Sequence, residues 1–164
     1  MGQMDINKLW QNFLDTVTNH YMDFNGRIGR AQFWYYVLVV FVIGVGVAIV
    51  ASLSTRLLST LFSLAMLLPN LGMTVRRLHD TGKPGIWVLL LAVPFVLSIL
   101  LGMSMIVGGA LGFLAFLLVF SSLIALASLA AAIVLIYFCA QPGEAAANAY
   151  GPPPPVWTPG ATAT

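Results

Sequence analysis

The residues of this chain that could do chemistry lie together in one charged segment, residues 76–87, with the sequence RRLHDTGKPGIW. A histidine beside an aspartate is a residue pair used in general acid–base catalysis. Neighbouring positions on a helix point about 100° apart, however, so His79 and Asp80 do not form a natural proton relay. No nucleophile or metal-ligand spacing accompanies them. We therefore expect no enzyme, metal or cofactor, and the one reaction left open is on a lipid headgroup at this pair.

A second use of the same charges is structural. If the segment is helical, Arg76 and Arg77 precede Asp80 by one turn and both can approach its carboxylate. An aspartate near a helix C-terminus is disfavoured by the helix dipole, which indicates a further partner. Arg27 and Arg30 are the candidates, so we predict that Asp80 ties that earlier arginine pair to the end of this helix.

A third use is contact with anionic membrane lipids, to which each basic residue near the surface contributes about 1 kcal/mol. This use can coexist with the ion network. The predicted charged cluster at the membrane interface comprises Arg27, Arg30, Arg76, Arg77, His79, Asp80 and Lys83.

The composition places these charges in an integral membrane protein. The 164 residues are 60% hydrophobic and 7% charged, whereas soluble domains contain roughly 25% charged residues. A net charge of +2, gathered beside hydrophobic segments, does not fit a nucleic-acid partner. The single cysteine, Cys139, excludes a disulfide within the chain.

The hydrophobic pattern predicts an amphipathic helix followed by four membrane spans. Apolar residues recur on one face of residues 8–21, which predicts a helix lying in the membrane interface, with packing on the helix bundle as the alternative. Uncharged stretches long enough to cross about 30 Å of hydrocarbon give the spans. The predicted spans are residues 34–54, 57–75, 86–105 and 113–138.

A proline and several aromatic residues mark positions along these spans. Pro69 removes the amide that would bond to the carbonyl of Ala65. We expect a kink there, with Asn70 or a neighbouring helix satisfying the exposed groups. Aromatic rings at the ends of spans prefer the headgroup layer. The predicted interfacial aromatics are Trp34, Tyr35 and Trp87.

These segments predict an all-α membrane protein with four transmembrane helices in two antiparallel hairpins. Residues 1–149 form a single membrane domain, and residues 150–164, which contain GPPPP, form a flexible proline-rich tail. Both termini then lie on the side that receives every basic residue except Arg56. The positive-inside rule makes that side cytoplasmic.

Two functions remain open for such a protein. The first is a non-enzymatic module that contacts partners or anionic lipids through its cytoplasmic face. The second is a small transporter or channel formed by homo-oligomerisation, which draws on Pro69, Asn70 and Pro94 within the spans. Small residues such as Ala127 and Ala131 share one face of the fourth span and could pack either within the bundle or between copies. The absence of Asp, Glu, Lys, Arg and His from the predicted hydrocarbon region counts against the second function.

Three sequence stretches carry a resemblance to a known family. They are FNGRIGRAQFWYY, LPNLGMTVRRLHDTGKPGIW and PGEAAANAYGPPPP, and together they extend over nearly the whole chain. The chain resembles the domain of unknown function 805 family of small bacterial inner-membrane proteins. The resemblance implies a bacterial inner-membrane location and no particular reaction. The chain departs from the family at Pro84, where serine is frequent, and at Ala149, where a basic residue is common.

Overall fold

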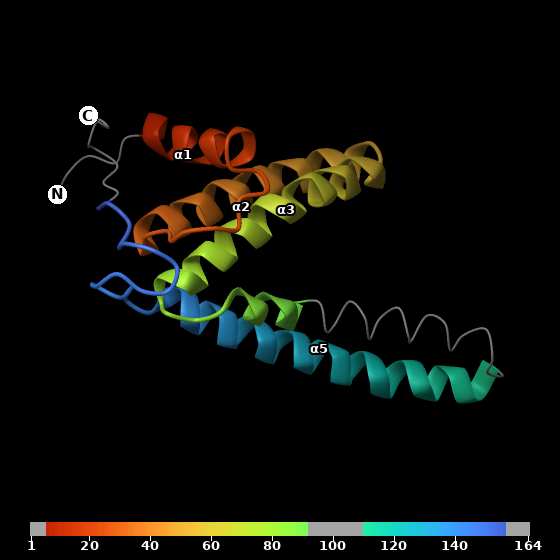
Figure 1. The fold of residues 1–164 in the computed structure, drawn as a ribbon. Coiled ribbons are helices and arrows are strands. Elements are labelled where there is room, and N and C mark those ends of the chain that lie inside the picture. Colours follow the sequence, from red (N-terminus) through yellow and green to blue (C-terminus); the bar gives the residue numbers. More distant parts are fainter. Residues whose placement is uncertain (1–5, 92–109, 157–164) are drawn as a thin grey trace. The chain divides into compact units, whose positions relative to one another are not determined.

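The computed structural model describes residues 6–91 and 110–156, without the side chains of residues 110–119. The chain forms two compact units, Met1–Gly85 with Gln141–Thr164, and Ile86–Ala140. Over the described ranges the regular elements are helices and no strand is present, which confirms the all-α class (Figure 1). The helices α2, α3 and the Phe120–Ala140 part of α5 are long and apolar enough to cross a membrane. The elements are α1 (Ile6–Thr18), α2 (Arg30–Leu53), α3 (Arg56–Asp80), the 3₁₀ helix η1 (Gly85–Leu91) and α5 (Ala110–Ala140).

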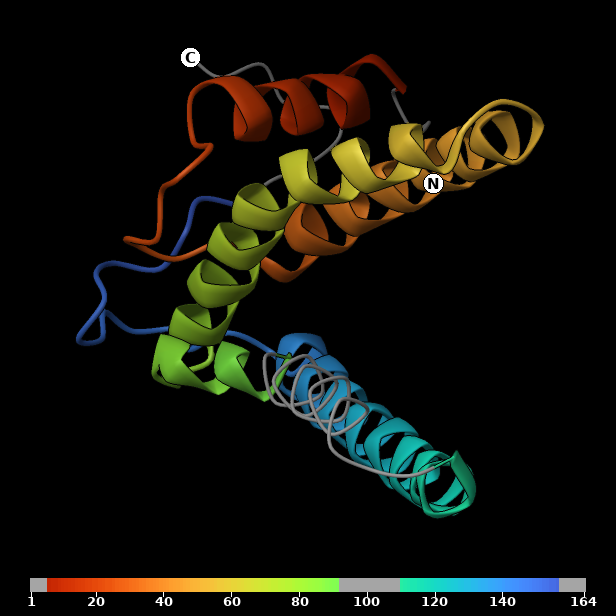
Figure 2. The same ribbon diagram turned by 90° about the vertical axis from the view of Figure 1, so that its right-hand side faces the viewer.

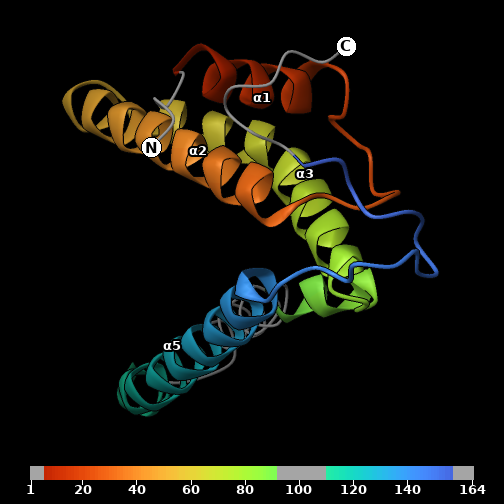
Figure 3. The same cartoon turned by 90° about the vertical axis from the view of Figure 1, so that its left-hand side faces the viewer.

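Helices α2 and α3 form an antiparallel hairpin whose turn lies at Ser54 and Thr55. The Thr55 hydroxyl caps α3 by accepting from the amide of Leu57 at 3.0 Å. Figures 2 and 3 show the two helices side by side along much of their length, with α1 packed over them. As the sequence predicts, α3 continues beyond Val75 and ends at Asp80, so its last turn carries the charged residues.

Helix α1 packs against both helices of the hairpin. The side chain of Asn12 exchanges hydrogen bonds with Gln32, donating to its carbonyl at 3.2 Å and accepting from its amide at 3.0 Å. The rings of Phe13 and Tyr36 stack with centroids 6.2 Å apart. This is the bundle packing that the sequence left as the alternative to a purely interfacial position. The exposed face of α1 is mixed, with the apolar Trp10 and Leu14 beside the polar Gln11 and Asp15.

The connection between α1 and α2 runs along α3. The Tyr21 hydroxyl donates to the carbonyl of Ala65 at 2.7 Å, which is the carbonyl that Pro69 leaves without its helical partner. The satisfying group therefore comes from this connection, whereas Asn70 or a neighbouring helix was expected. Farther on, the Ile28 amide donates to the carbonyl of Arg76 at 3.2 Å.

The second unit contains η1 and α5. The predicted third span, residues 86–105, begins in η1, and its residues 92–105 lie outside the described residues. The predicted fourth span, residues 113–138, lies within α5. The Trp87 ring meets Phe138 edge-on with centroids 5.2 Å apart, and Cys139 is a buried free thiol.

Candidate functional site

Three buried side chains, Arg27, Arg77 and Asp80, form an ion cluster that we call the clasp. The Arg27 Nε and Nη2 atoms lie 3.1 and 3.0 Å from Asp80 Oδ1. Arg77 Nη1 bonds to the other carboxylate oxygen, Oδ2. The side chains of Arg27, Arg77 and Asp80 are 1%, 0% and 4% exposed. The predicted tie between Asp80 and the earlier arginine pair is thus present, and it is made through Arg27.

Local structure brings the three charges together. Arg77 and Asp80 lie three residues apart in the last turn of α3, so they share one helical face. Arg27 follows Gly26, whose φ of +77° is a left-handed conformation that favours glycine. That turn, together with the hydrogen bond from Ile28 to α3, directs Arg27 toward the end of the helix.

The five N–H groups of Arg27 all find acceptors, three of them from the segment that follows α5. Its Nη1 donates to the carbonyl oxygens of Ala146 at 2.8 Å and Gly151 at 3.2 Å. Its Nη2 donates to the carbonyl of Glu144, besides contacting Asp80. Residues 141–151, here called the C-terminal segment, therefore complete the coordination of this guanidinium.

The same segment also contacts the other two members of the clasp. Arg77 donates to the carbonyl of Gln141 and, at 3.3 Å, to that of Ile28. The Glu144 amide donates to the backbone carbonyl of Asp80 at 2.8 Å. At Gly143 an added Cβ would collide with the Asp80 carboxylate, so the backbone approaches closely because this residue has no side chain.

The clasp holds two positive charges and one negative charge in a buried setting. Burying unpaired charge is costly, and the main-chain carbonyl dipoles of the C-terminal segment offset the excess positive charge. With Arg27 fully hydrogen-bonded and both Asp80 oxygens occupied, neither group is placed to act on a substrate. The geometry of the clasp is that of a structural ion cluster, which holds the α1–α2 connection and the C-terminal segment to the end of α3.

His79 lies beside the clasp and contacts the C-terminal segment through its ring. The rings of His79 and Tyr150 stack with centroids 3.8 Å apart and planes 3° from parallel. His79 Nδ1 lies 3.1 Å from the Gly26 carbonyl, so this nitrogen carries the proton. Asn148 donates to the His79 carbonyl at 2.9 Å and to the Glu144 carboxylate at 2.8 Å. The ring thus packs and donates, and it does not form a relay with Asp80.

The remaining basic residues of the predicted cluster lie outside the clasp. Arg76 Nη1 is 3.8 Å from Asp23, a distance typical of a weak ion pair. Lys83 Nζ donates to the Gln141 side chain at 3.0 Å. Arg30 is the first residue of α2 and is exposed.

Asp23 is a titratable residue in the connection between α1 and α2, outside the predicted spans. Partial burial alone would raise its pKa, but hydrogen bonds from the Asn25 amide and from His20, together with nearby Arg76, hold the pKa below 3.8. The carboxylate is therefore ionised at neutral pH.

The other predicted residues occupy three different places. Trp34 and Tyr35 lie in the first turns of α2, half-buried. Trp87 belongs to η1 in the second unit. Pro69 lies inside α3, and the neighbouring Asn70 accepts a hydrogen bond from Tyr36 at 2.8 Å.

Sequence reasoning missed the contribution of the C-terminal segment. Gln141, Glu144 and Asn148 were not predicted as site residues, and the tail was predicted to begin at residue 150. In the structure Tyr150 stacks on His79, and the next residue accepts from Arg27. A usable signal was the group of polar residues directly after the last apolar stretch, because the even number of spans expected from the sequence would return them to the side of the charged segment.

Comparisons with known proteins agree with the motifs. Residues 21–152 match the family described as protein of unknown function, DUF805. The inner membrane protein YhaI of Escherichia coli is 37% identical over 84 residues, covering 49% of this chain and 71% of YhaI. YhaH, also named an inner membrane protein, is 31% identical over 49% of this chain and 72% of its own length.

A further E. coli relative, the uncharacterized protein YiiR, is 36% identical over 50% of this chain and 58% of its own length. No solved structure matches the chain. The matched region begins at Tyr21 and ends at Pro152, so it contains every residue of the clasp and of the C-terminal segment. The chain is an integral membrane protein that belongs to the DUF805 family.

Proposed function

We propose that this protein is a non-enzymatic interaction module of the bacterial inner membrane that contacts anionic lipids through its cytoplasmic face. The observation that carries the proposal is that the C-terminal segment of the same chain completes the hydrogen bonding of the clasp. The clasp side chains are buried, and its two arginines donate hydrogen bonds to the C-terminal segment, while Arg30 at the same end of the hairpin is exposed. Relatives named inner membrane proteins support the location.

Contacts within the first unit support the proposed topology of four spans in two hairpins. The chain leaves α3 at Asp80, and the residue that follows α5, Gln141, contacts Arg77 and Lys83. The intervening chain must therefore return to the side from which it departed. An even number of crossings satisfies this condition, and we propose that the uncharged residues 86–105 of the sequence account for the crossing besides α5.

The orientation follows from charge. Arg27, Arg76 and Arg77 lie at the clasp end of the hairpin, with Arg30 at the start of α2, whereas Arg56 begins α3 at the opposite end. Basic residues are enriched on the cytoplasmic side of inner-membrane proteins. The clasp, the C-terminal segment and both termini then face the cytoplasm.

The lipid contact is assigned to the basic residues outside the clasp. Arg76 and Lys83 lie outside the clasp and are less buried than Arg27 and Arg77, and each would contribute about 1 kcal/mol near an anionic surface. Arg27 and Arg77 are excluded from this role by their burial.

The proposal is tested by native mass spectrometry of the full chain released from nanodiscs containing equal phosphatidylglycerol and phosphatidylcholine. We expect retained phosphatidylglycerol to exceed phosphatidylcholine, and the excess to fall several-fold in an Arg76→Gln, Lys83→Gln variant. The matched control is Arg56→Gln at the other end of the hairpin, which should keep the excess. Equal retention of both lipids by the unaltered protein would refute lipid contact.

The second candidate is a small transporter or channel built from several copies. A hollow of about 290 Å³ between α2 and α3, with Asn70 and Thr74 on one wall, is the observation that favours it. No Asp, Glu, Lys, Arg or His occurs between Arg30 and Arg56 or between Arg56 and Arg76, which disfavours an ion route through these helices. Solute flux into liposomes that contain the purified protein would support this candidate over the first.

A further inference from the structure

The surface of helix α1 divides into three sectors. The sector buried against the hairpin comprises Leu9, Asn12, Phe13 and Thr16. At about 100° per residue, the exposed residues form two flanks, one on each side of this buried sector. The apolar flank comprises Ile6, Trp10 and Leu14, and the polar flank comprises Asn7, Gln11, Asp15 and Thr18. The exposed surface of α1 is therefore mixed in composition, but its apolar and polar residues are separated in space.

The exposure of α3 changes at Pro69. Before this residue the helix carries a band of large exposed apolar side chains, namely Leu57, Leu58, Leu61, Leu64 and Leu67. From Pro69 to Asp80, a stretch that the structure describes in full, no residue is exposed. Helix α1, the connection that follows it and the C-terminal segment cover this second part. The part of α3 whose exposed leucines suit a hydrocarbon environment therefore ends at the level of Pro69.

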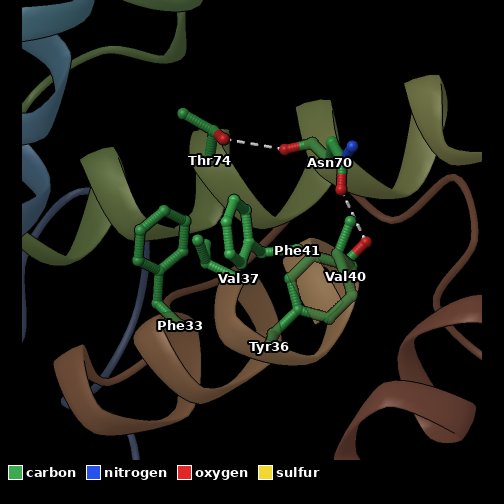
Figure 4. A pocket seen from close by; sticks show the side chains of 7 residues that line it. All are labelled: Phe33, Tyr36, Val37, Val40, Phe41, Asn70 and Thr74. Carbon is green, nitrogen blue, oxygen red and sulfur yellow. Dashed lines mark hydrogen bonds between the residues drawn. The ribbon is translucent and has the colours of Figure 1, made fainter. Parts of the chain in front are cut away.

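Tyr36 marks the same level on α2. Its hydroxyl donates to the side-chain oxygen of Asn70, the residue after Pro69, at 2.8 Å (Figure 4). The large exposed apolar side chains of α2 begin at the next residue, Val37, and continue to Leu53. That stretch rises about 24 Å, which is most of the roughly 30 Å of hydrocarbon in a bilayer. The exposed apolar bands of both helices thus end at one common level.

Helix α1 lies across this level. The Thr16 hydroxyl contacts the Met73 sulfur at 3.8 Å, on the covered side of Pro69. The Tyr21 hydroxyl, just beyond the end of α1, donates at 2.7 Å to the carbonyl of Ala65, which belongs to the exposed part of α3. The helix is therefore attached to the hairpin where the apolar bands end.

We propose that the apolar flank of α1 lies in the cytoplasmic surface of the lipid bilayer, with the polar flank turned toward water. A helix in the membrane interface presents an apolar sector to the acyl chains and a polar sector to water. The buried third sector of α1 holds it on the hairpin at the same time. Trp10, in the apolar flank, has the type of ring that prefers the headgroup layer.

Continuity with the hairpin selects the bilayer as the occupant of the apolar flank. The exposed apolar bands that end beside α1 belong to helices long and apolar enough to cross a membrane. A protein partner would need a larger surface, because stable protein interfaces take roughly 20 to 30 residues a side. The apolar flank offers only Ile6, Trp10 and Leu14. This membrane contact goes beyond the proposed function, because it uses apolar side chains and requires no charge on the lipid.

The test measures which flank of α1 meets lipid. In the full chain carrying Cys139→Ala, a spin label is attached to one introduced cysteine at a time, and the protein is reconstituted in phosphatidylcholine vesicles. The substitutions are Trp10→Cys and Leu14→Cys on the apolar flank, and Gln11→Cys and Thr18→Cys on the polar flank. Power saturation in electron paramagnetic resonance then compares collisions with oxygen, which concentrates in hydrocarbon, and with a water-soluble nickel chelate. We expect oxygen collisions to exceed nickel collisions several-fold on the apolar flank, and the order to reverse on the polar flank.

Leu64→Cys, in the exposed apolar band of α3, is the lipid-facing reference and should behave like the apolar flank. Gel filtration and circular dichroism check that each labelled variant is folded. An excess of nickel collisions on both flanks would overturn the proposal, because α1 would then lie in water. An excess of oxygen collisions on both flanks would place α1 inside the hydrocarbon and would also overturn it. Few collisions with either reagent on the apolar flank would overturn it as well, because a second copy or another part of the chain would then cover the flank.

The outcome is separate from that of the proposed function, because these vesicles contain no anionic lipid. If the apolar flank meets lipid while the mass spectra show no preference for phosphatidylglycerol, the contact through α1 stands and the proposed function fails. If both flanks meet water while Arg76 and Lys83 still retain phosphatidylglycerol, the contact through α1 is wrong and the proposed function stands.

Discussion

Asp80 is the residue whose replacement tests the clasp most directly. Its two carboxylate oxygens are each bound by one arginine, and its side chain is 4% exposed. In Asp80→Ala the guanidinium groups of Arg27 and Arg77 would remain buried without a counter-charge. Removing one partner of a buried ion pair costs about 3 to 5 kcal/mol, so we expect a loss of this size in the free energy of unfolding.

The measurement is reversible unfolding of the full chain in mixed micelles, followed by circular dichroism as the fraction of denaturing detergent rises. The matched control is Asp23→Ala. Asp23 is 33% exposed and lies 3.8 Å from Arg76, so its loss should cost less than about 1 kcal/mol. The comparison separates burial from charge, because both variants remove one aspartate from an ion pair with an arginine.

A double-mutant cycle with Arg27→Gln tests whether the two residues act as one unit. We expect the combined variant to be less destabilised than the sum of the single variants, by between about 0.5 and 3 kcal/mol. Exchanging the two residues should not restore stability, because the carbonyls of Ala146 and Gly151 would then face a carboxylate. A loss below about 1 kcal/mol in the free energy of unfolding of Asp80→Ala, or strict additivity in the cycle, would refute the conclusion that the clasp stabilises this end of the protein.

Three further predictions concern the connection between α1 and α2. Tyr21→Phe should cost about 1 kcal/mol in the same unfolding assay, because it leaves the carbonyl of Ala65 without its hydroxyl donor. Gly72→Ala should cost between about 1 and 3 kcal/mol, because its Cβ would lie 2.8 Å from the backbone oxygen of Asp23, whereas Gly46→Ala meets nothing within 4 Å and should not destabilise. The lowered pKa of Asp23 gives a contribution to stability that is complete above pH 3.8 and is lost as the pH falls through the folded-state pKa; the stability difference between the unaltered protein and Asp23→Asn should therefore shrink in acid.

The parts of this structure that follow from local rules could be predicted from the sequence. Helical spacing brings Arg77 to Asp80, and the dipole argument correctly required a further cation, which is Arg27. The geometry of proline correctly singled out the carbonyl of Ala65 as a group in need of a donor. Each of these inferences needs only a few neighbouring residues and a known backbone geometry.

The acceptors of the arginines could not be predicted in the same way. They are main-chain carbonyls, which every residue carries, so no side-chain pattern distinguishes Ala146 or Gly151 from its neighbours. Their position depends on where the chain returns after α5, which is a property of the whole topology. The close approach at Gly143 is likewise set by tertiary packing, since its glycine also fits an ordinary loop.

The clasp is assembled from parts of the chain that lie far apart in the sequence, and this limits the stage of folding at which it can form. Arg27 precedes α2, Arg77 and Asp80 end α3, and the carbonyls that complete the arginine coordination follow α5. Until α5 is in place, two buried guanidinium groups share one carboxylate and lack those acceptors, so the arrangement is favourable only for the finished chain. The densest charged motif in the sequence therefore joins the first hairpin to the segment that follows the last helix. Any loss of cellular activity on changing this motif should be attributed to chemistry only after folding has been measured.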